Sequence, residues 1–558
     1  MITVKFLRPL TIATLLTIPS TLLGQSASPP TVQTARQLIR QQKFTEAAAI
    51  LQAIVEREPD NPQAWFSLGV ARHSAGDLES ALTAHLKATA YQQTAARAMY
   101  NAGMAYALMG DKDKAFEWLE KSLATGSLNM TNIAFDSDAE TLRDDIRYRA
   151  LFPTDAEYAD PFVEDAVVLQ EWRGETQGDQ FGWIAKNIGD VDGDGINDVV
   201  TSAPSFSGSG RGAGKVYVFS TRTGEELWSV SGQAGWSLGL GLDAAGDVNA
   251  DGVPDVVAGA PGGDRSFVYS GRDGSILFEL AAEQPGEQHG RKVSEIGDAN
   301  GDGHDDVLIG APLNDANGRD AGRSYLHSGK DGSLLLTLTG ERAGDRFGSA
   351  VGGMVWNGEP WLVVGAPNAG PNQGGRTYVY RGLNSEPAFV IEADDSGAQL
   401  GGMFVSVLGD VNGDGMPDIY ASDWSANANG PGAGRVYIHS GADGSRMTVL
   451  SGEARGDGFG IGAADAGDVD GDGHADLVIG AWQHRGAAPS GGKVYLYSGR
   501  DFSLLRVWTG QVMGETFGFD ATGMGDVDGD GYGDVLLTSA WSAINGARSG
   551  RMFILSGR

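Results

Sequence analysis

The feature that most constrains this chain is a unit that recurs seven times between residue 181 and the C-terminus, at intervals of 51 to 58 residues. We interpret the start of each unit as an apolar residue followed by glycine, with an aspartate eight positions after that glycine. The glycine–aspartate pairs are Gly182 and Asp190, Gly239 and Asp247, Gly290 and Asp298, Gly402 and Asp410, Gly460 and Asp468, and Gly518 and Asp526. In the fourth unit Gly348 leads to Trp356, so the aspartate is missing. A period of this length is typical of folds built from copies of one supersecondary unit.

Each unit also carries the signals of four short strands. A Gly-Ala-Pro triplet or a variant follows the aspartates, as at 259–261, 310–312 and 365–367. An alternating strand such as 215–220 comes next, and a tight turn such as 271–274 leads into a fourth strand. Four strands in about 56 residues, repeated seven times, is the pattern of propeller blades. We therefore predict an all-β seven-bladed propeller over residues 167–558, and an open array of separate hairpin units is the alternative.

The two ends of this region predict how the ring closes. Val167 to Trp172 have the pattern of a fourth strand, although no first strand precedes them. The last unit ends at 556–558 without a fourth strand. If the early strand completes the last blade, no open edge is left between the first and last blades.

Six of the seven units carry the pattern D-x-[DN]-x-D-G-x-x-D. Oxygen ligands at positions 1, 3 and 5 can converge on one cation, glycine at position 6 permits a sharp turn, and position 7 offers a backbone carbonyl. We expect the aspartate at position 9 to complete the set. The predicted ligands are Asp190, Asp192, Asp194, Ile196 and Asp198; Asp247, Asn249, Asp251, Val253 and Asp255; Asp298, Asn300, Asp302, His304 and Asp306; Asp410, Asn412, Asp414, Met416 and Asp418; Asp468, Asp470, Asp472, His474 and Asp476; and Asp526, Asp528, Asp530, Tyr532 and Asp534.

Calcium suits these loops better than magnesium, because calcium takes six to eight oxygen ligands in flexible geometry. Carboxylates this close together would repel one another without a metal. The loops are not EF-hands, because position 12 never holds the bidentate glutamate of that motif; it is Thr201, Ala258, Ile309, Ala421, Ile479 or Leu537. We predict about six Ca²⁺ sites with a structural role that couples folding to metal binding.

These units resemble the FG-GAP repeat of the integrin α-chain propeller, as in Phe181-Gly182 with Ala203-Pro204 and Phe347-Gly348 with 365–367. The resemblance covers about residues 167–558, and it implies calcium-stabilised blades and a role in adhesion or ligand binding outside the cell. The chain departs from integrin α chains, because it has more calcium loops than they usually carry, no inserted ligand-binding domain, no leg domains and no membrane span. Integrin function as such is therefore not implied, and exported bacterial proteins of this repeat type look like a closer comparison.

A second repeat, with a period of 34 residues, lies between residues 31 and 130. Gly69 and Gly103, Gly76 and Gly110, and Ala81 and Ala115 are each 34 residues apart. Small residues at fixed helical offsets let two antiparallel helices approach closely, and Pro59 and Pro62 end the preceding helix. This pattern resembles the tetratricopeptide repeat, with units at 31–61, 62–95 and 96–129. We predict an all-α module over 31–150, with a cap at 135–152 and a connector at 151–166. The family implies a groove for a peptide or protein, and a stack that only spaces or stiffens is the alternative.

Residues 1–24 have the pattern of an export signal. Lys5 and Arg8 precede a short apolar stretch, and small or polar residues follow it. An amphipathic N-terminal helix is the alternative, and 25–30 would be a linker. No other stretch approaches the ~18 apolar residues of a membrane span. We therefore expect an exported chain, secreted or periplasmic, with no transmembrane anchor.

Composition excludes several function classes. The chain has no cysteine, which excludes disulfides, thiolate metal sites and thiol catalysis. Its formal net charge of −31 disfavours nucleic acid and anionic lipid as partners. The eight histidines are scattered, and neither a G-x-S-x-G elbow nor a phosphate-binding G-x-x-x-x-G-K-[ST] loop is present. We therefore expect a binding protein and not an enzyme, with a cryptic hydrolase as the least favoured reading.

The loops between second and third strands share one face of the predicted ring, and variable loops on a rigid scaffold are where binding tends to occur. Trp424, Trp482 and Trp541 replace the proline of the triplet on that face, and His484 and Arg485 follow one of them. Such a cluster could hold a protein or a glycan; packing of the tryptophans between blades is the alternative. The leading interpretation is a scaffold for protein or glycan binding and adhesion, in which the helical module docks a second protein. A lectin-like module is the alternative.

Overall fold

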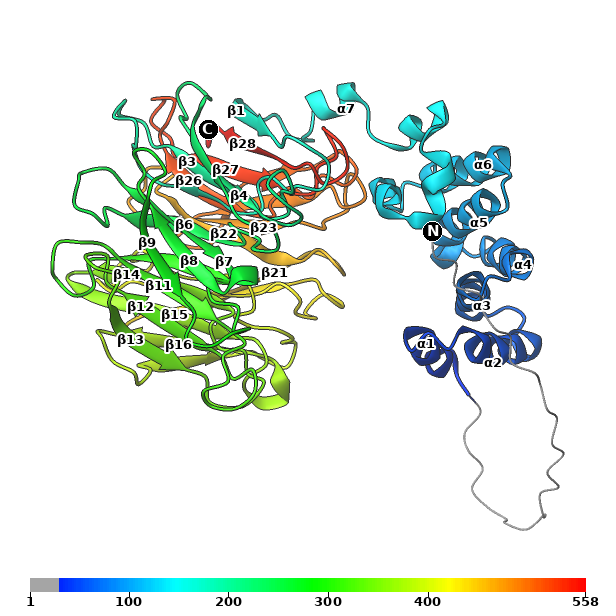
Figure 1. Ribbon diagram of the computed structural model, residues 1–558, viewed down its shortest axis with the longest axis horizontal. Helices are drawn as coiled ribbons and strands as arrows, with labels where there is room; N and C mark the ends of the chain where they lie inside the picture. Colours follow the sequence, from blue (N-terminus) through cyan, green and yellow to red (C-terminus); the bar gives the residue numbers. More distant parts are fainter. Residues whose placement is uncertain (1–29) are drawn as a thin grey trace, which may run out of the picture. The chain divides into compact units, whose positions relative to one another are not determined.

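The computed structural model describes residues 30–558, without the side chains at 463 and 464, and it confirms the predicted fold of helical repeats followed by a seven-bladed β-propeller (Figure 1). The predicted export signal lies outside the described residues, as does all of the predicted linker except its last residue. The described residues form two compact units, 30–105 and 106–558. No described helix is both long enough and apolar enough to cross a bilayer.

The first unit consists of paired helices. Its helices are α1 (Val32–Arg40), α2 (Phe44–Arg57), α3 (Pro62–Ser74) and α4 (Leu78–Ala88), followed by the start of α5 (Gln92–Leu108). Asn61 and Asp77 cap α3 and α4 by accepting hydrogen bonds from backbone N–H groups of the first turn. Gly76 adopts a φ of +83° in the turn between these two helices, which explains one of the glycines in the 34-residue period.

A series of short helices leads from the third helix pair to the propeller. These elements are α6 (Lys112–Leu123), η1 (Met130–Phe135), η2 (Ser137–Leu142), η3 (Ile146–Leu151) and α7 (Asp155–Ala159). Arg147 in η3 lies over the ring of Phe116 in α6, 4.3 Å from its centre, and forms an ion pair with Asp113. The segment 135–152, predicted to be a cap, therefore contains two complete 3₁₀ helices, η2 and η3, and η3 packs on α6.

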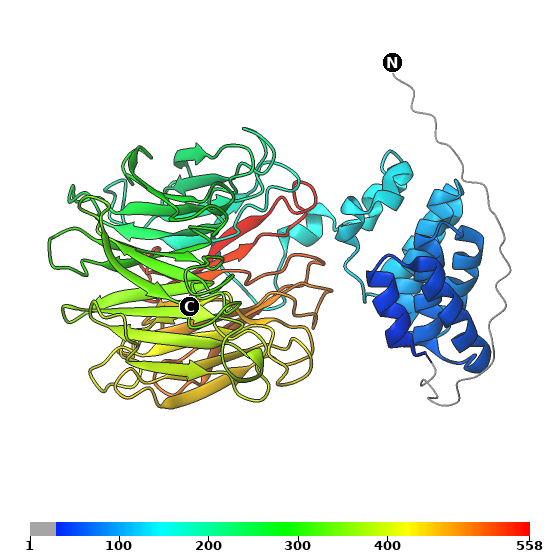
Figure 2. The ribbon, with the colours of Figure 1, turned by 60° about the horizontal axis from the view of Figure 1, so that its bottom comes forward.

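The propeller consists of seven four-stranded antiparallel sheets (Figure 2). Blade 1 is β2 (Ala185–Asn187), β3 (Val199–Ala203), β4 (Lys215–Phe219) and β5 (Glu226–Ser231). Blade 2 is β6 (Gly241–Gly246), β7 (Asp255–Ala260), β8 (Arg265–Tyr269) and β9 (Ile276–Ala281). Blade 3 is β10 (Lys292–Gly297), β11 (Asp306–Ala311), β12 (Arg323–His327) and β13 (Leu334–Thr339). Blade 4 is β14 (Ala350–Trp356), β15 (Glu359–Ala366), β16 (Arg376–Arg381) and β17 (Phe389–Glu392). Blade 5 is β18 (Val405–Val407), β19 (Ile419–Asp423), β20 (Arg435–His439) and β21 (Arg446–Ser451). Blade 6 is β22 (Phe459–Gly467), β23 (Asp476–Ala481), β24 (Lys493–Tyr497) and β25 (Leu504–Thr509).

Blade 7 is closed by a strand from the start of the propeller, as the chain ends predict. Its strands are β26 (Ala521–Gly525), β27 (Asp534–Ser539), β28 (Arg551–Leu555) and the early strand β1 (Val168–Arg173), which pairs antiparallel with β28 (Figure 1). Trp172 of β1 donates from its indole nitrogen to the carbonyl of Gly224 in blade 1 at 2.9 Å. The early strand therefore completes the last blade and also contacts the first.

The Phe-Gly and Gly-Ala-Pro signatures meet where one blade packs against the next. The glycine of the triplet lies against the carbonyl of the Phe-Gly glycine in the following blade, and a Cβ atom there would come within 3.0 Å of that oxygen. The pairs are Gly259 with Gly290, Gly310 with Gly348, Gly365 with Gly401, and Gly480 with Gly518. The residue before the Phe-Gly glycine is buried in the same junctions, as with Phe347 and Phe459. These glycines are therefore needed for close backbone contact between blades.

Two units differ from the predicted pattern of an apolar residue followed by glycine at the start of each unit. In blade 5 the glycine that meets the preceding blade is Gly401, after the buried Leu400, and not Gly402; one extra residue then separates it from the aspartate. In blade 3 the residue before Gly290 is His289, which is buried and is not apolar. The predicted first glycine of blade 5, Gly402, was therefore wrong by one residue. Residues 401 and 402 are both glycine, and the repeat pattern selected the second of them.

The segment entering the propeller is attached to the closing blade by polar and apolar contacts. Val163 donates to the carbonyl of Thr509 at 2.9 Å, and the buried Phe162 packs on Phe517 with ring centres 4.6 Å apart. Arg551, which has no exposed surface, pairs with the equally buried Glu515 at 2.6 Å and donates to the carbonyl of Tyr158 at 3.0 Å. Residues 158–163 are thus tied to blades 6 and 7.

We expect Gly365→Ala to destabilise the propeller, because its methyl group would overlap the carbonyl of Gly401 in the next blade. The matched control is Gly374→Ala in the same blade, where the nearest atom would lie at 3.4 Å, an ordinary contact. Overpacking typically costs about 1–3 kcal/mol. Thermal unfolding should show a clear drop in melting temperature for the first variant and little change for the second; equal melting temperatures would contradict the account of these glycines.

Candidate metal centres

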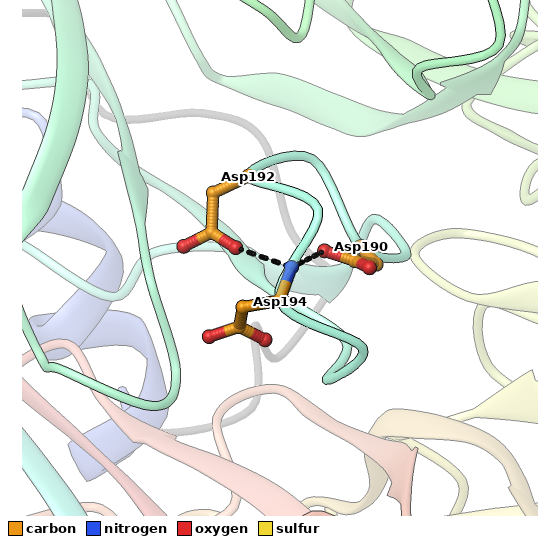
Figure 3. A group of neighbouring side chains, drawn as sticks. All are labelled: Asp190, Asp192 and Asp194. Carbon is orange, nitrogen blue, oxygen red and sulfur yellow. Dashed lines mark hydrogen bonds between the residues drawn. The ribbon is translucent and has the colours of Figure 1, made fainter.

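The six acidic loops join the first and second strands of blades 1, 2, 3, 5, 6 and 7, at one end of the ring. In blade 1 the loop curls so that the backbone N–H of Asp194 donates to carboxylate oxygens of Asp190 (3.0 Å) and Asp192 (3.1 Å), which brings the three side chains together (Figure 3). The glycine at position 6 adopts a φ of +87° there, which a residue with a side chain rarely adopts.

The same curl repeats around the ring. In all six loops the position-6 glycine donates its backbone N–H to the position-1 aspartate at 2.7–2.9 Å. The position-7 residue donates its N–H to the position-5 aspartate at 2.9–3.2 Å. The six copies of the motif therefore adopt the same backbone hydrogen bonds, which hold the carboxylates of positions 1 and 5 against the backbone of the loop.

In three loops the carboxylates converge closely enough to share one cation. One oxygen from each member lies within 4.8 Å of the others in the groups Asp190, Asp192 and Asp194; Asp468, Asp470 and Asp476; and Asp526, Asp528 and Asp534. The loops of blades 2, 3 and 5 have asparagine at position 3, so an amide oxygen replaces one carboxylate. Carboxylate oxygens keep free lone pairs after accepting a backbone N–H. The donor set is therefore all oxygen, which suits a hard dication such as Ca²⁺.

The aspartate at position 9 has a second role that the sequence pattern did not reveal. It has no exposed surface in any of the six loops; these residues are Asp198, Asp255, Asp306, Asp418, Asp476 and Asp534. One oxygen accepts the N–H of position 2 at 2.8–3.0 Å. The other accepts an N–H at 2.9–3.2 Å, from the turn between third and fourth strands in blades 1, 2, 3, 5 and 6, and from Gly557 after the third strand in blade 7. Position 9 therefore links each acidic loop to the segment that follows the third strand of its blade.

Burial raises the pKa of five of these position-9 carboxyls to about 6, and it raises the pKa of Asp476 in the same direction. In every case desolvation is the largest cause, and the backbone hydrogen bonds oppose it. A dication beside these groups would offset the desolvation and favour the ionised carboxylate.

Neighbouring loops are also linked to one another. The imidazoles of His304 and His474, both at position 7, contact the carbonyls of Val248 and Val411 in the preceding loop at 2.7 and 3.1 Å. In blade 4, where a hairpin replaces the loop, Trp356 donates from its indole nitrogen to the carbonyl of Gly415 in the following loop, that of blade 5, at 3.1 Å. Blade 4 thus contacts the loop of blade 5 although it lacks the acidic loop.

The tryptophans at the opposite end of the ring form one cluster. The ring of Trp482 lies between those of Trp541 (4.3 Å) and Trp424 (6.5 Å), which belong to the two neighbouring blades. Trp482 is 6 % exposed and the other two are partly buried, whereas Arg485 is exposed and His484 is buried beside Asp457. The structure therefore brings the three predicted tryptophans together, with contacts between blades, and it leaves Arg485 open to solvent.

Models described as FG-GAP repeat match residues 187–219, 295–327 and 462–497, and those described as FG-GAP-like repeat match 247–309 and 410–479. Tetratricopeptide repeat models match 32–95 and 96–124. The chain contains FG-GAP and tetratricopeptide repeats.

The chain is similar to parts of several integrin α chains. It is 31 % identical to integrin alpha-5 of Xenopus laevis over 221 residues, which is 36 % of this chain and 21 % of the relative. It is 34 % identical to integrin alpha-8 of Homo sapiens over 169 residues (27 % and 16 %), and 31 % identical to integrin alpha pat-2 of Caenorhabditis elegans over 219 residues (33 % and 18 %). The chain therefore spans only about a fifth of the length of these relatives.

Two substitutions in the loop of blade 1, one at position 1 and one at position 3, test the roles of these positions in metal binding. Asp190→Asn at position 1 should remove one metal site or weaken it at least about tenfold, because Asp190 accepts three backbone N–H groups through both oxygens and asparagine has one acceptor oxygen. Asp192→Asn at position 3 should keep the site, since blades 2, 3 and 5 carry asparagine there. Titration calorimetry with Ca²⁺ counts the sites; loss of a site in Asp192→Asn, or none in Asp190→Asn, would contradict these roles.

Proposed function

We propose that this chain is an exported, calcium-binding propeller scaffold that binds a protein partner, and whose tetratricopeptide module docks a second protein. The observation that carries the proposal is the shared hydrogen-bonded geometry of the six loops, each with an all-oxygen donor set and three with converging carboxylates. Uncompensated carboxylates at this spacing repel one another, so bound cations would stabilise this end of the ring.

A structural role fits these sites better than a catalytic one. The loops recur in six blades, whereas a catalytic site would be expected in one. In blades 1, 2, 3, 5 and 6 the position-9 aspartate also links the two loops of the blade, so an ion held there would fix both hairpins at once. The repeat families also support a binding scaffold, and a hydrolase remains the least favoured function.

On the face that carries the tryptophan cluster, opposite the acidic loops, a protein partner is favoured over a glycan. Trp482 is 6 % exposed and packs edge-on against its neighbours, so its ring face is not free to stack on a sugar. The exposed guanidinium of Arg485, close to this cluster in sequence, offers charge-assisted hydrogen bonds to an acidic group of a partner. The variable loops around it supply the remaining surface.

The calcium proposal is tested by thermal unfolding of the full chain in Ca²⁺, in Mg²⁺ and in chelator, together with calorimetric titration. A ligand present at 100 times its dissociation constant stabilises the folded state by about 2.7 kcal/mol per site. We expect about six ions to bind and the melting temperature to rise strongly with Ca²⁺ and less with Mg²⁺. An unchanged melting temperature with no heat of binding would contradict the proposal.

The partner face is tested with two charge reversals on opposite ends of the ring. Arg485→Glu lies in a loop between second and third strands, and Lys330→Glu lies in an exposed turn between third and fourth strands. Proteins that copurify with the wild-type chain from its native source should be lost with Arg485→Glu and retained with Lys330→Glu. Retention with Arg485→Glu would place the interface elsewhere.

A further inference from the structure

The first strands of the blades line an axial cavity of about 490 Å³. Most of its wall consists of small or apolar residues, but five ionisable side chains also line it: Lys186, Asp243, Lys292, Glu295 and Asp465. None of them belongs to the acidic loops or to the tryptophan face. The cavity is therefore a polar site separate from the candidate metal centres.

The propeller fold does not require charged residues at the positions of Lys186 and Lys292. Lys292 pairs with Gly310 in its sheet, and the equivalent residues of blades 2 and 4 are Gly241 and Ala350. Lys186 pairs with Val200, and the residues at the same level of blades 4 and 7 are Gly352 and Thr522. Since uncharged residues serve the same strand position in other blades, these charges call for a different explanation.

The charge of Lys186 is balanced within the wall. Its ammonium lies 3.7 Å from the buried carboxylate of Asp520, which also accepts the backbone N–H of Ala185 at 3.2 Å. Burial alone would lower the pKa of Lys186, but Asp520 and Asp243 outweigh it and the pKa is raised. Lys186 is therefore a charged member of a structural pair.

Lys292 differs from Lys186, because its ammonium has no ion-pair partner among the described residues. The residue is 8 % exposed and lines the cavity, and its ammonium lies over the ring of Phe404, 4.3 Å from the ring centre, two blades away. Among the described residues, no carboxylate oxygen lies within 4.0 Å of this ammonium and no hydrogen bond to it is formed. Burial is the main cause that lowers its pKa, to about 7. A buried ammonium without an anionic partner is costly.

We propose that the axial cavity binds a small hydroxy or amino carboxylic acid, with the ammonium of Lys292 holding its carboxylate. A volume of this size lies within the ~300–1,000 Å³ of small-molecule sites. Met403, Phe404 and Val293 line the cavity and provide apolar contact for the carbon skeleton. Glu295 lies three residues from Lys292 on β10, roughly 10 Å along the strand, and could accept a hydrogen bond from a hydroxyl or amino group.

The experiment uses the full chain in Ca²⁺ buffer, with lactate, glycerate, alanine and serine as probes in ligand-observed NMR and calorimetry. Acetate, chloride and inorganic phosphate are the comparison anions. We expect at least one hydroxy or amino acid to bind at one site and more tightly than all three comparison anions. Lys292→Met should weaken that binding at least about tenfold, equivalent to 1.4 kcal/mol. Lys330→Met, at an exposed lysine in a turn, should leave it unchanged.

Two further readouts separate binding from folding. Lys292→Met should melt no lower than the wild type, since it replaces a buried unpaired charge by an apolar chain. Lys292→Arg keeps the charge and should retain part of the affinity.

Affinity should also fall as pH rises from 6 to 8, because Lys292 loses its proton over that range. The ionisable groups around its ammonium are Arg291, Lys186, Asp243, Glu295, Asp465 and Asp520. Burial raises the pKa of Glu295 to about 7, so this carboxyl becomes negative over the same range and repels an anion further.

Absence of binding by all four probes, or unchanged affinity in Lys292→Met, would overturn the proposal. Equal or tighter binding of chloride, phosphate or acetate would overturn the assignment to a hydroxy or amino acid.

Discussion

At four junctions, neighbouring blades meet in a contact made by backbone alone. Where the triplet glycine of one blade lies on the carbonyl of the next blade's Phe-Gly glycine, no Cβ atom fits. The buried aromatic or leucine residue before that second glycine fills the space beside the contact. This backbone contact forms at four of the seven junctions; at the other three, Ser202, Ser422 or Thr538 lies beside the glycine of the next blade.

The acidic loops lie at the other end of the same first strands. Each loop begins where a first strand ends, and its position-9 aspartate links it to the segment that follows the third strand of its blade. Side chains such as His304 and Trp356 then connect one loop to its neighbour. For β10, the strand that carries Lys292, the contact of Gly290 with Gly259 lies at one end and the contacts of the acidic loop lie at the other. Both ends of this strand are therefore held by neighbouring backbone, and a binding site requires such support.

The sequence predicts this fold well because its strongest signals are local and repeated. The Gly-Ala-Pro triplets, the D-x-[DN]-x-D-G loops and the unpaired strand at 167–172 each specify a turn, a loop or an edge within a few residues. What could not be predicted depends on residues far apart in the chain. The pairing of Arg551 with Glu515 and Tyr158, and the position of Lys292 over Phe404, arise only when the ring closes. The register of Gly401 was missed because two adjacent glycines fit the pattern equally well, and only the contact with Gly365 distinguishes them.

The central claim is that the acidic loops hold cations and that the hairpin of blade 4 does not. The most direct measurement is a crystal structure of the chain grown with Ca²⁺, with an anomalous difference map calculated from long-wavelength data. Six peaks are predicted, one within each of the loops of blades 1, 2, 3, 5, 6 and 7, and none at the hairpin 356–359. A map without peaks in these loops would contradict the account, because the carboxylates would then be held together by backbone hydrogen bonds alone.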